Sequence, residues 1–223
     1  MNITLAFDVY GTLFDTHNIV TKLREIVGDK AEAFSRTWRD KQLEYSFRRG
    51  LMQNYQNFAI CTSNALDYAC IYYNTPLTKV KKNELLDAYR ALPAFKDVEE
   101  SLARLKKADF RLYAFSNGSE IVVVTLLEAA GIRDYFLDVV SVDDIKTFKP
   151  DPAVYRYFLK KSGAENTNSW LISSNPFDVI GAQSVGMRSV WVQRSQKMIF
   201  DPWGVEPTIT VKSLGELNVH MFI

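Results

Sequence analysis

Residues Leu5–Asp15 read LAFDVYGTLFD, and this stretch decides how the rest of the chain is organised. The run Ile3–Phe7 is short, apolar and β-prone, which is typical of a strand buried on both faces of a sheet. Asp8 ends the run, and Gly11 then supplies the backbone freedom that a tight turn requires. Open α/β sheets bind ligands at the carboxyl ends of their strands, so Asp8 is predicted to lie at a ligand site. A carboxylate buried there requires cations and N–H donors around it.

The composition is that of an ordinary globular protein. The 223 residues are 47% hydrophobic and 24% charged, and a net charge of +1 indicates neither nucleic acid nor an anionic membrane as a partner. Cys61 and Cys70 have no His or Cys neighbours at metal-ligand spacing and are interpreted as buried thiols. The first residues read as a strand rather than a signal peptide, and no apolar run is long enough to span a membrane. We therefore expect a cytoplasmic protein.

The pattern of apolar residues changes along the chain. From about residue 18 to 92 they recur at helical spacing, which predicts an all-helical block of about four helices. From Val98 onward helical and β-prone runs alternate, which predicts a parallel sheet with helices on both faces. The predicted fold is an α/β core, residues 1–15 and 95–223, with a helical cap inserted at residues 16–94 and a pocket between them. After residue 95 the expected strands are 110–115, 139–142, 169–172, 189–192 and an edge strand at 208–211, and the expected helices are 98–107, 121–130, 154–161 and 179–185.

Polar side chains follow several of the predicted strands at their carboxyl ends, which meet at one edge of a parallel sheet. Helices that begin after these loops direct free N–H groups to the same place, which favours the binding of an anion. We therefore expect these groups to converge although they are far apart in the sequence. They are Asp8 with Thr12, Ser116 with Asn117, Lys149, and the loop 173–178.

These motifs resemble those of the haloacid dehalogenase superfamily, in family order and over essentially the full length of the chain. Within the superfamily the chain is similar to the L-2-haloacid dehalogenases, whose first motif matches residues 8–15, DVYGTLFD. Segments 38–45 (WRDKQLEY), 116–119 (SNGS), 149–151 (KPD) and 173–175 (SSN) match as well. The resemblance implies a Rossmann-like parallel-sheet core with helices on both faces and an inserted cap of the four-helix-bundle type.

The residue two positions after Asp8 separates two chemistries within the superfamily. Phosphatases carry a second Asp there, as general acid and metal ligand, whereas this chain has Tyr10. A tyrosine cannot complete a carboxylate cage for Mg²⁺, so we expect neither a metal nor a cofactor. The resemblance implies that Asp8 displaces halide from C2 of an L-2-haloalkanoic acid, and that water hydrolyses the resulting ester to the D-2-hydroxy acid with inversion at C2. The alternatives are a Mg²⁺-dependent small-molecule phosphatase and a non-catalytic binding protein on the same fold.

The resemblance assigns cations and donors to the predicted site. Lys149, which on its own could be a solvated surface lysine, would keep the Asp8 carboxylate ionised. Arg39, which could otherwise form a solvated salt bridge on its helix, would bind the departing halide, with Asn117 as a further donor. Thr12 would support the nucleophile, or simply be a turn hydroxyl.

Asp178 has two possible roles. It could cap the helix predicted at 179–185, or it could activate the water that hydrolyses the ester. The resemblance favours the activation of water. The residues implied to support this step are Lys149, Ser173 and Asn175, which would orient the base, and Tyr155, which would contribute a hydrogen bond or simply be a core tyrosine.

The remaining predicted residues would bind the substrate and the second subunit. Ser116 and the amides of Asn117 and Gly118 would bind the substrate carboxylate, which is compatible with capping a helix that begins near Ser119. The small-molecule 2-haloacid and the halide ion are the implied partners, together with a second copy of the chain. Tyr10, Leu43, Phe58 and Phe177 would line the alkyl pocket, although they could be core residues, and the homodimer would form through cap helices that expose residues such as Leu51 and Met52.

Overall fold

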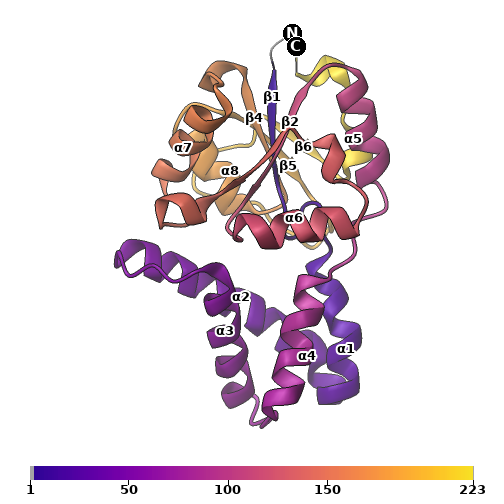
Figure 1. The fold of residues 1–223 in the computed structure, drawn as a ribbon, viewed down its shortest axis with the longest axis vertical. Helices are drawn as coiled ribbons and strands as arrows, with labels where there is room; N and C mark the ends of the chain where they lie inside the picture. Colours follow the sequence, from indigo (N-terminus) through magenta and orange to yellow (C-terminus); the bar gives the residue numbers. More distant parts are fainter. Residues whose placement is uncertain (1–2, 223) are drawn as a thin grey trace.

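The computed structural model describes residues 3–222, which form an α/β core and a helical block on one side of it (Figure 1). Within these residues six parallel strands form one sheet in the order β3-β2-β1-β4-β5-β6. The predicted fold class and the predicted edge strand are therefore confirmed. The strands are β1 (Thr4–Asp8), β2 (Arg111–Ser116), β3 (Asp138–Ser141), β4 (Ser169–Ser173), β5 (Arg188–Val192) and β6 (Ile209–Val211).

The central strand β1 is buried along its whole length, because strands flank it on both sides and helices cover both faces of the sheet. It pairs with β2 so that Asp8 lies opposite Phe115, and with β4 so that Phe7 lies opposite Ile172. The chain builds the sheet outward from β1 first in one direction and then in the other. Asp8 therefore lies at the point where the strand order reverses, which is where open α/β sheets form their binding crevice.

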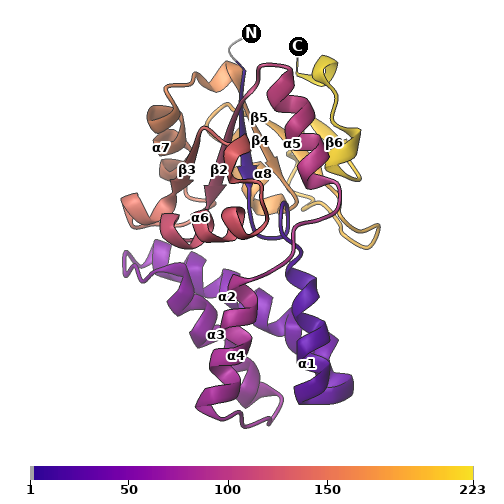
Figure 2. The same cartoon turned by 45° about the vertical axis from the view of Figure 1, so that its right-hand side comes forward.

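Helices cover the sheet on both faces, as predicted. Two lie on one face and two on the other (Figure 2). Two of them begin earlier than the sequence pattern suggested, because Pro152 and Pro176 occupy the first helical turn, where a missing N–H costs nothing. One pair is α5 (Val98–Lys107) with α6 (Glu120–Ala129), and the other is α7 (Pro152–Ser162) with α8 (Pro176–Gln183).

The helical block lies against the carboxyl edge of the sheet (Figure 1). Two linkers join it to the core, and they run side by side: Asp15 N donates to the carbonyl of Pro93 at 2.9 Å, and Phe95 N donates to the carbonyl of Leu13 at 2.9 Å. Because the chain leaves and re-enters the core here, we propose residues 16–94 as a cap domain. Its helices are α1 (Ile19–Val27), α2 (Ala31–Leu51), α3 (Phe58–Tyr72) and α4 (Lys79–Arg90).

The predictions about the cap surface and the thiols have different outcomes. Cys61 and Cys70 are both buried and unpaired on α3, which confirms the interpretation as free thiols. Leu51 and Met52, at the end of α2, are exposed, and their part in a homodimer stays a prediction. In the span from residue 3 to 222, no helix is both long enough and apolar enough to cross a membrane.

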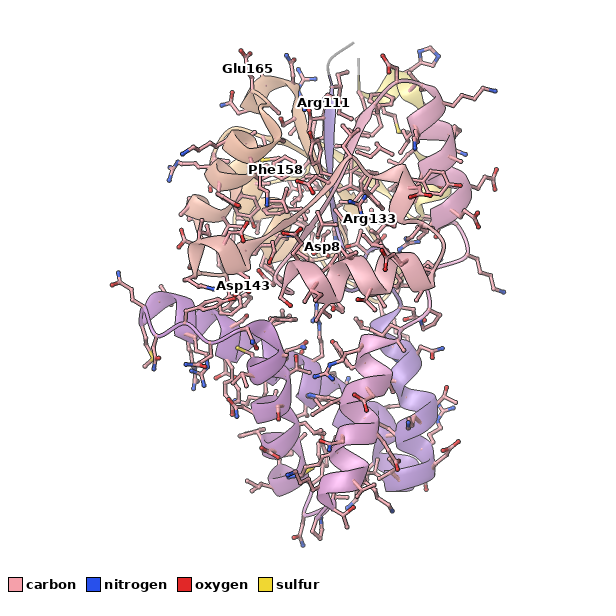
Figure 3. All side chains as sticks on the ribbon, in the orientation of Figure 1. Asp8, Arg111, Arg133, Asp143, Phe158 and Glu165 are labelled. Atoms are coloured by element: carbon pink, nitrogen blue, oxygen red, sulfur yellow. The ribbon has the colours of Figure 1, made fainter. Side chains whose placement is uncertain are left out.

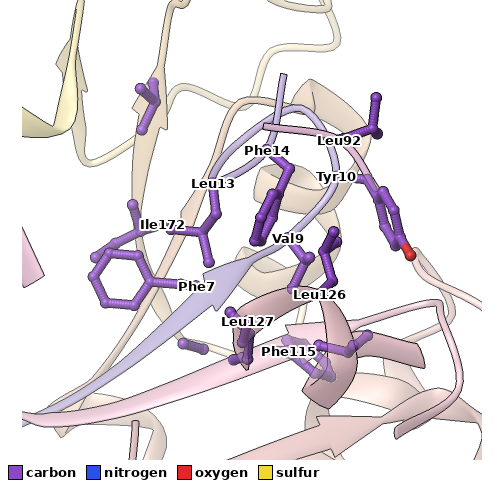
Figure 4. Close-up of a cluster of buried hydrophobic side chains, with 14 of the residues drawn as sticks. Phe7, Val9, Tyr10, Leu13, Phe14, Leu92, Phe115, Leu126, Leu127 and Ile172 are labelled. Atoms are coloured by element: carbon purple, nitrogen blue, oxygen red, sulfur yellow. The ribbon is translucent and has the colours of Figure 1, made fainter. Parts of the chain in front are cut away.

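The turn after β1 holds the loop that surrounds Asp8. Gly11 has a φ of +88°, and its N–H donates to the carbonyl of Phe14 at 2.9 Å, so the predicted tight turn is confirmed. Val9, Leu13 and Phe14 are buried in an apolar cluster beneath this turn (Figure 4). The turn is therefore anchored by core packing and positioned by one residue in a conformation that disfavours side chains.

We expect Gly11→Ala to lower the free energy of unfolding by about 1–2 kcal/mol, because an L-residue is strained at this positive φ. Gly215→Ala is the matched control, since the φ of Gly215 is ordinary and its added Cβ would meet only Ser213 Oγ, at 3.4 Å. The control should leave stability unchanged or raise it by about 0.4–1 kcal/mol. Equilibrium unfolding in urea measures both. Equal effects of the two substitutions would contradict the strain at Gly11.

Candidate active site

Asp8 lies at the sheet edge that faces the cap (Figure 3), and its carboxylate is buried among hydrogen-bond donors. Lys149 Nζ donates to Oδ1 at 3.1 Å, and Thr12 Oγ1 and Asn175 Nδ2 each donate to Oδ2 at 2.8 Å. The donors come from three segments that follow different strands. The predicted convergence at the carboxyl edge of the sheet is therefore observed for these residues.

Lys149 joins two buried carboxylates. Its ammonium is almost completely inaccessible and donates to Asp8 Oδ1, to Asp178 Oδ2 at 2.8 Å and to the carbonyl of Phe115 at 2.9 Å. These acceptors match the three N–H donors of a lysine. Burial lowers the pKa of Lys149, but the charges of Asp178 and Asp8 outweigh burial and raise that pKa overall. Lys149 is therefore a buried cation and not the surface lysine that was the alternative.

Asp178 is completely buried in the first turn of α8. Its Oδ1 accepts a hydrogen bond from the Tyr155 hydroxyl at 2.8 Å, and its Oδ2 accepts from Lys149. Burial raises the pKa of Asp178, assisted by the charge of Asp8 and opposed by Lys149 and Tyr155. The capping alternative is wrong, because Pro176 begins the helix earlier and makes Asn175 the N-cap residue. Asp178 is thus a buried carboxylate with a raised pKa beside a second carboxylate.

The loop after β4 contacts Asp8 rather than Asp178. Asn175 donates its side-chain amide to Asp8 and to the carbonyl of Tyr10, at 2.8 and 3.2 Å, while Ser173 Oγ accepts from Asn175 N at 3.1 Å. Ser173 and Asn175 therefore do not orient Asp178 as predicted; they orient the Asp8 carboxylate. Thr12 Oγ1 accepts from the backbone N–H of Ser174 at 2.8 Å, which leaves the Thr12 hydroxyl proton for Asp8.

The loop after β2 differs in part from the prediction. Asn117 Oδ1 accepts from the backbone N–H of Lys149 at 3.0 Å, which turns the side-chain NH₂ of Asn117 away from that bond and leaves it available as a donor. Gly118 N–H donates to Ser116 Oγ at 3.0 Å. The Gly118 amide therefore has a partner within the loop, and its part in binding a substrate carboxylate stays a prediction.

Aromatic side chains from core and cap form an apolar wall near Asp8. The ring of Tyr10 lies 6.1 Å from the rings of both Phe58 and Tyr89, and burial raises the pKa of Tyr10, which keeps its hydroxyl neutral. These rings, with Leu86 and Val122, line a cavity of about 40 Å³. Tyr10 and Phe58 thus lie together, as the predicted alkyl pocket requires.

A larger cleft opens between cap and core. It has a volume of about 900 Å³, and Arg39 and Leu43 of α2 line it together with Gly11 and Asn175 of the core. Leu43 therefore borders this cleft and not the small cavity of Phe58. Phe177 lines neither of the two, and its ring instead packs against Phe47 of the cap at 5.0 Å.

Arg39 is held by neutral partners. Its Nη1 donates to Gln42 Oε1 at 2.6 Å and to the Tyr89 hydroxyl at 3.4 Å. Among residues 3–222 no carboxylate lies within 4.0 Å of the guanidinium, so the salt-bridge alternative is wrong. Sequence reasoning missed Gln42 and Tyr89. The spacing of three residues between Arg39 and Gln42, which places both on one helix face, is the signal that could have indicated the first of them.

The acidic groups of this site do not form a metal cage. Residues 3–222 contain no group of three or more His, Cys, Asp or Glu side chains placed to hold a metal ion. Asp8 and Asp178 are instead bridged by the Lys149 ammonium, which occupies the position between them. The donor set therefore fits a buried cation of the protein itself better than a divalent metal ion.

Several known proteins are similar to this chain in sequence and in fold. The sequence profile of the haloacid dehalogenase-like hydrolases matches residues 4–186. An (S)-2-haloacid dehalogenase of Pseudomonas putida is 35% identical over 214 residues, which cover 96% of this chain and 94% of that protein. An (S)-2-haloacid dehalogenase of Pseudomonas sp. strain YL is 36% identical over 210 residues, covering 94% and 90%. The structure of an L-2-haloacid dehalogenase from Xanthobacter autotrophicus, with chloropropionic acid covalently bound, is similar with a TM-score of 0.90 at 29% identity, covering 96% of both chains.

Lys149→Met should lower the free energy of unfolding by about 3–5 kcal/mol at neutral pH, because it leaves two buried carboxylates without their cation. Lys161→Met is the matched control: it removes the partner of Asp144 from an ion pair that is accessible to solvent, and it should cost about 0–1 kcal/mol. The deficit of Lys149→Met should shrink as the pH falls, since the already raised pKa of Asp178 rises further without the lysine and the protonated carboxyl needs no counter-charge. Urea unfolding over a pH series measures this. A deficit as small as that of the control would refute the buried bridge.

Proposed function

The chain belongs to the haloacid dehalogenase-like hydrolases, and on this premise we propose that it converts L-2-haloalkanoic acids to D-2-hydroxyalkanoic acids and halide. The observation that carries the proposal is the Lys149 ammonium between the buried carboxylates of Asp8 and Asp178. It allows both groups to be ionised in one site, one as nucleophile and the other as base.

In the first step Asp8 attacks C2 of the substrate from the face opposite the halogen. The attacking atom is Oδ1. Lys149 donates to one lone pair of Oδ1 and leaves the other lone pair open, whereas Thr12 and Asn175 donate to both lone pairs of Oδ2. The new C2–O bond forms as the carbon–halogen bond breaks, and the halide leaves with the electron pair. C2 is inverted, and the product of this step is an ester of Asp8.

The departing halide needs a preorganised positive partner, or the displacement gains little over the reaction in water. Arg39 supplies the charge from the cap, because it lines the cleft and its guanidinium forms no ion pair with a carboxylate among residues 3–222. The side-chain NH₂ of Asn117 is available as a second donor, since Lys149 N fixes the opposite end of that amide.

In the second step water attacks the carboxyl carbon of the Asp8 ester and not C2. Asp178 takes the proton from the water, as general base. Oδ2 is then the carbonyl oxygen of the ester, and the donors at 2.8 Å from Thr12 and Asn175 stabilise the negative charge that develops on it. The intermediate collapses by breaking the bond between the carboxyl carbon and Oδ1, and this oxygen takes the proton held by Asp178 and leaves as the hydroxyl of the hydroxy acid. The bond from this oxygen to C2 is never broken, so the inversion is retained, and each turnover releases one halide and one proton.

Substrate recognition uses the surroundings of Asp8. The substrate carboxylate binds at the loop of Ser116 and Asn117, where α6 begins and presents N–H groups. The wall formed by Tyr10 and Phe58 receives the alkyl group, with Leu43 in the larger cleft, and a cavity of about 40 Å³ suits a short alkyl group. Phe177 acts on this pocket indirectly, through its contact with the cap.

Assembly and location follow the same premise. A cytoplasmic homodimer is our proposal, and the exposed side chains of Leu51 and Met52 at the end of α2 support a dimer interface on the cap.

The two alternatives lack support from the site. A Mg²⁺-dependent phosphatase would need an acid at position 10, where the structure has a buried Tyr10 in an apolar wall. A non-catalytic binding protein would not need Asp8, Asp178 and an Arg39 without an ion-pair partner among residues 3–222 together. The hydrolytic dehalogenation uses all of them.

Halide release from L- and D-2-chloropropionate in the presence of EDTA tests the proposal. The native protein should release chloride from the L-isomer only, and Asp8→Asn, which keeps the shape but removes the nucleophilic charge, should release none. In ¹⁸O-water the first turnover should place label in Asp8 and not in the hydroxy acid, because water attacks the carboxyl carbon. Hydrolysis of phosphate esters with Mg²⁺ and no chloride release would establish the phosphatase instead, and inactivity in both assays would favour the binding protein.

Tyr155→Phe should move the acid limb of the rate of ester hydrolysis to higher pH. Asp178 accepts a proton only when ionised, and the hydrogen bond from Tyr155 lowers its pKa, so removing that bond raises the pKa. A hydrogen bond to a charged group is worth about 1.5–3 kcal/mol, which predicts a displacement of about 1–2 pH units. Tyr113→Phe is the control, because that hydroxyl bonds Arg111 on β2. Single-turnover rates measure both, and an acid limb that stays in place in Tyr155→Phe would exclude Asp178 as the base.

A further inference from the structure

The guanidinium of Arg39 is held by a buried network of neutral groups. Gln42 is completely buried, and its Oε1 accepts from Arg39 Nη1 at 2.6 Å and from the Tyr89 hydroxyl at 3.0 Å. Its Nε2 donates to Thr62 Oγ1 at 2.5 Å. Both ends of the Gln42 amide therefore have partners, which is the condition for a polar group in an apolar interior.

The direction of each hydrogen bond in this network is determined. The hydroxyl of Thr62 donates to the carbonyl of Phe58 at 2.8 Å, so its oxygen can only accept from Gln42. Gln42 must therefore present its NH₂ to Thr62 and its oxygen to Arg39. The alternative orientation of the amide would bring two donors together at Arg39 and leave Thr62 without its donor. Hydrogen bonding thus fixes the oxygen of Gln42 behind the guanidinium.

The network also fixes the backbone around Arg39. Gln42 belongs to α2, Thr62 to α3 and Tyr89 to α4, so three cap helices contribute to it. Trp38 Nε1 donates to the carbonyl of Thr62 at 2.9 Å, and the ring of Trp38 packs 5.4 Å from that of Tyr89. A guanidinium bound to this cluster is preorganised by packing that already exists in the free protein.

Every partner of Arg39 in this network is uncharged. Within residues 3–222 its hydrogen bonds go only to Gln42 and Tyr89 through Nη1, which leaves Nη2 and Nε as donors for a ligand. Arg39 lines the same cleft as Asn175, whose side-chain amide donates to Asp8. A carboxylate in place of Gln42 would hold Arg39 equally well, but it would cancel the charge that an anion needs.

We propose that Gln42 is a positioning residue that aims the Arg39 guanidinium into the cleft and, being neutral, leaves its charge for the leaving halide. The inference rests on the proposed function for the halide, and it adds the residue that acts behind Arg39. Thr62 extends the same role, because it fixes which end of the Gln42 amide faces the guanidinium.

Gln42→Glu separates charge from shape, because the two side chains are nearly identical in size and both offer an oxygen to Arg39. We expect kcat for L-2-chloropropionate to fall by about 10²–10³-fold, as when one electrostatic donor to a transition state is removed. Inhibition by added bromide should weaken as well, while KM should change less than kcat. Gln56→Glu is the matched control, since it adds the same charge at an exposed position of the cap and should leave both quantities unchanged.

A second variant covers the possibility that the new buried charge prevents folding. Thr62→Val removes the acceptor of Gln42 Nε2 and frees the amide to turn, so it should lower kcat and weaken bromide inhibition in the same direction without adding charge. A purely structural role would reduce the amount of folded protein and leave the bromide inhibition constant of the folded fraction unchanged. That result, in whichever of the two variants folds, would overturn the proposal.

A measurement without turnover keeps this inference distinct from the proposed function. Bromide binding to Asp8→Asn, measured by calorimetry at constant ionic strength, should be weakened in Asp8→Asn/Gln42→Glu and retained in Asp8→Asn/Gln56→Glu. If the native protein releases no halide, the proposed function fails, while this binding comparison still tests Gln42. Equal bromide affinity in the three proteins, or no bromide binding in any, would overturn the role of Gln42.

Discussion

The ammonium of Lys149, buried between Asp8 and Asp178, is the interaction on which the site depends. Two carboxylates this close and this deeply buried could not both be ionised without a cation between them. The fold delivers that cation through parallel strands, because their carboxyl ends meet at one edge and bring together loops that are distant in sequence. The charges of Asp178 and Asp8 in turn raise the pKa of Lys149, so the two carboxylates stabilise the charged form of the lysine.

The buried cation of the core, Lys149, and the cation of the cap, Arg39, have opposite kinds of partners. In the core, the charge of Lys149 is compensated by two carboxylates, and its hydrogen bond holds the Asp8 carboxylate in place. In the cap, Arg39 donates hydrogen bonds to neutral groups, and among residues 3–222 no carboxylate forms an ion pair with it. One cation therefore neutralises anions of the protein, and in the proposed reaction the other would bind the halide that is released. If carboxylates neutralised the charges of both Lys149 and Arg39, the site would have no free positive charge to stabilise a departing halide.

Much of this arrangement could be predicted from the sequence. The apolar run that ends in Asp8, the glycine after it and the alternation of helix and strand identify the sheet edge, and order along the chain places Thr12, Lys149 and the loop 173–178 beside it. What could not be predicted depends on side-chain direction. Nothing in the residue pattern says that Asn175 turns to Asp8 and not to Asp178, because that direction depends on how the loop after β4 packs against the turn after β1. The role of Gln42 could not be predicted for a related reason. A polar residue on an amphipathic helix is expected to face solvent, and only the tertiary packing shows that Gln42 is buried.

The paired linkers have a consequence for the timing of the reaction. The donors to Asp8 come from Thr12, Lys149 and Asn175, all on the core side of the linkers, whereas Arg39 belongs to the cap. A pivot of the cap about this hinge would change the distance between Arg39 and Asp8 and leave the donors around Asp8 untouched. In the proposed reaction, such a pivot would move the group that binds the halide and leave the donors to the Asp8 carboxylate in place, so the halide could leave without disturbing the carboxylate for the next turnover.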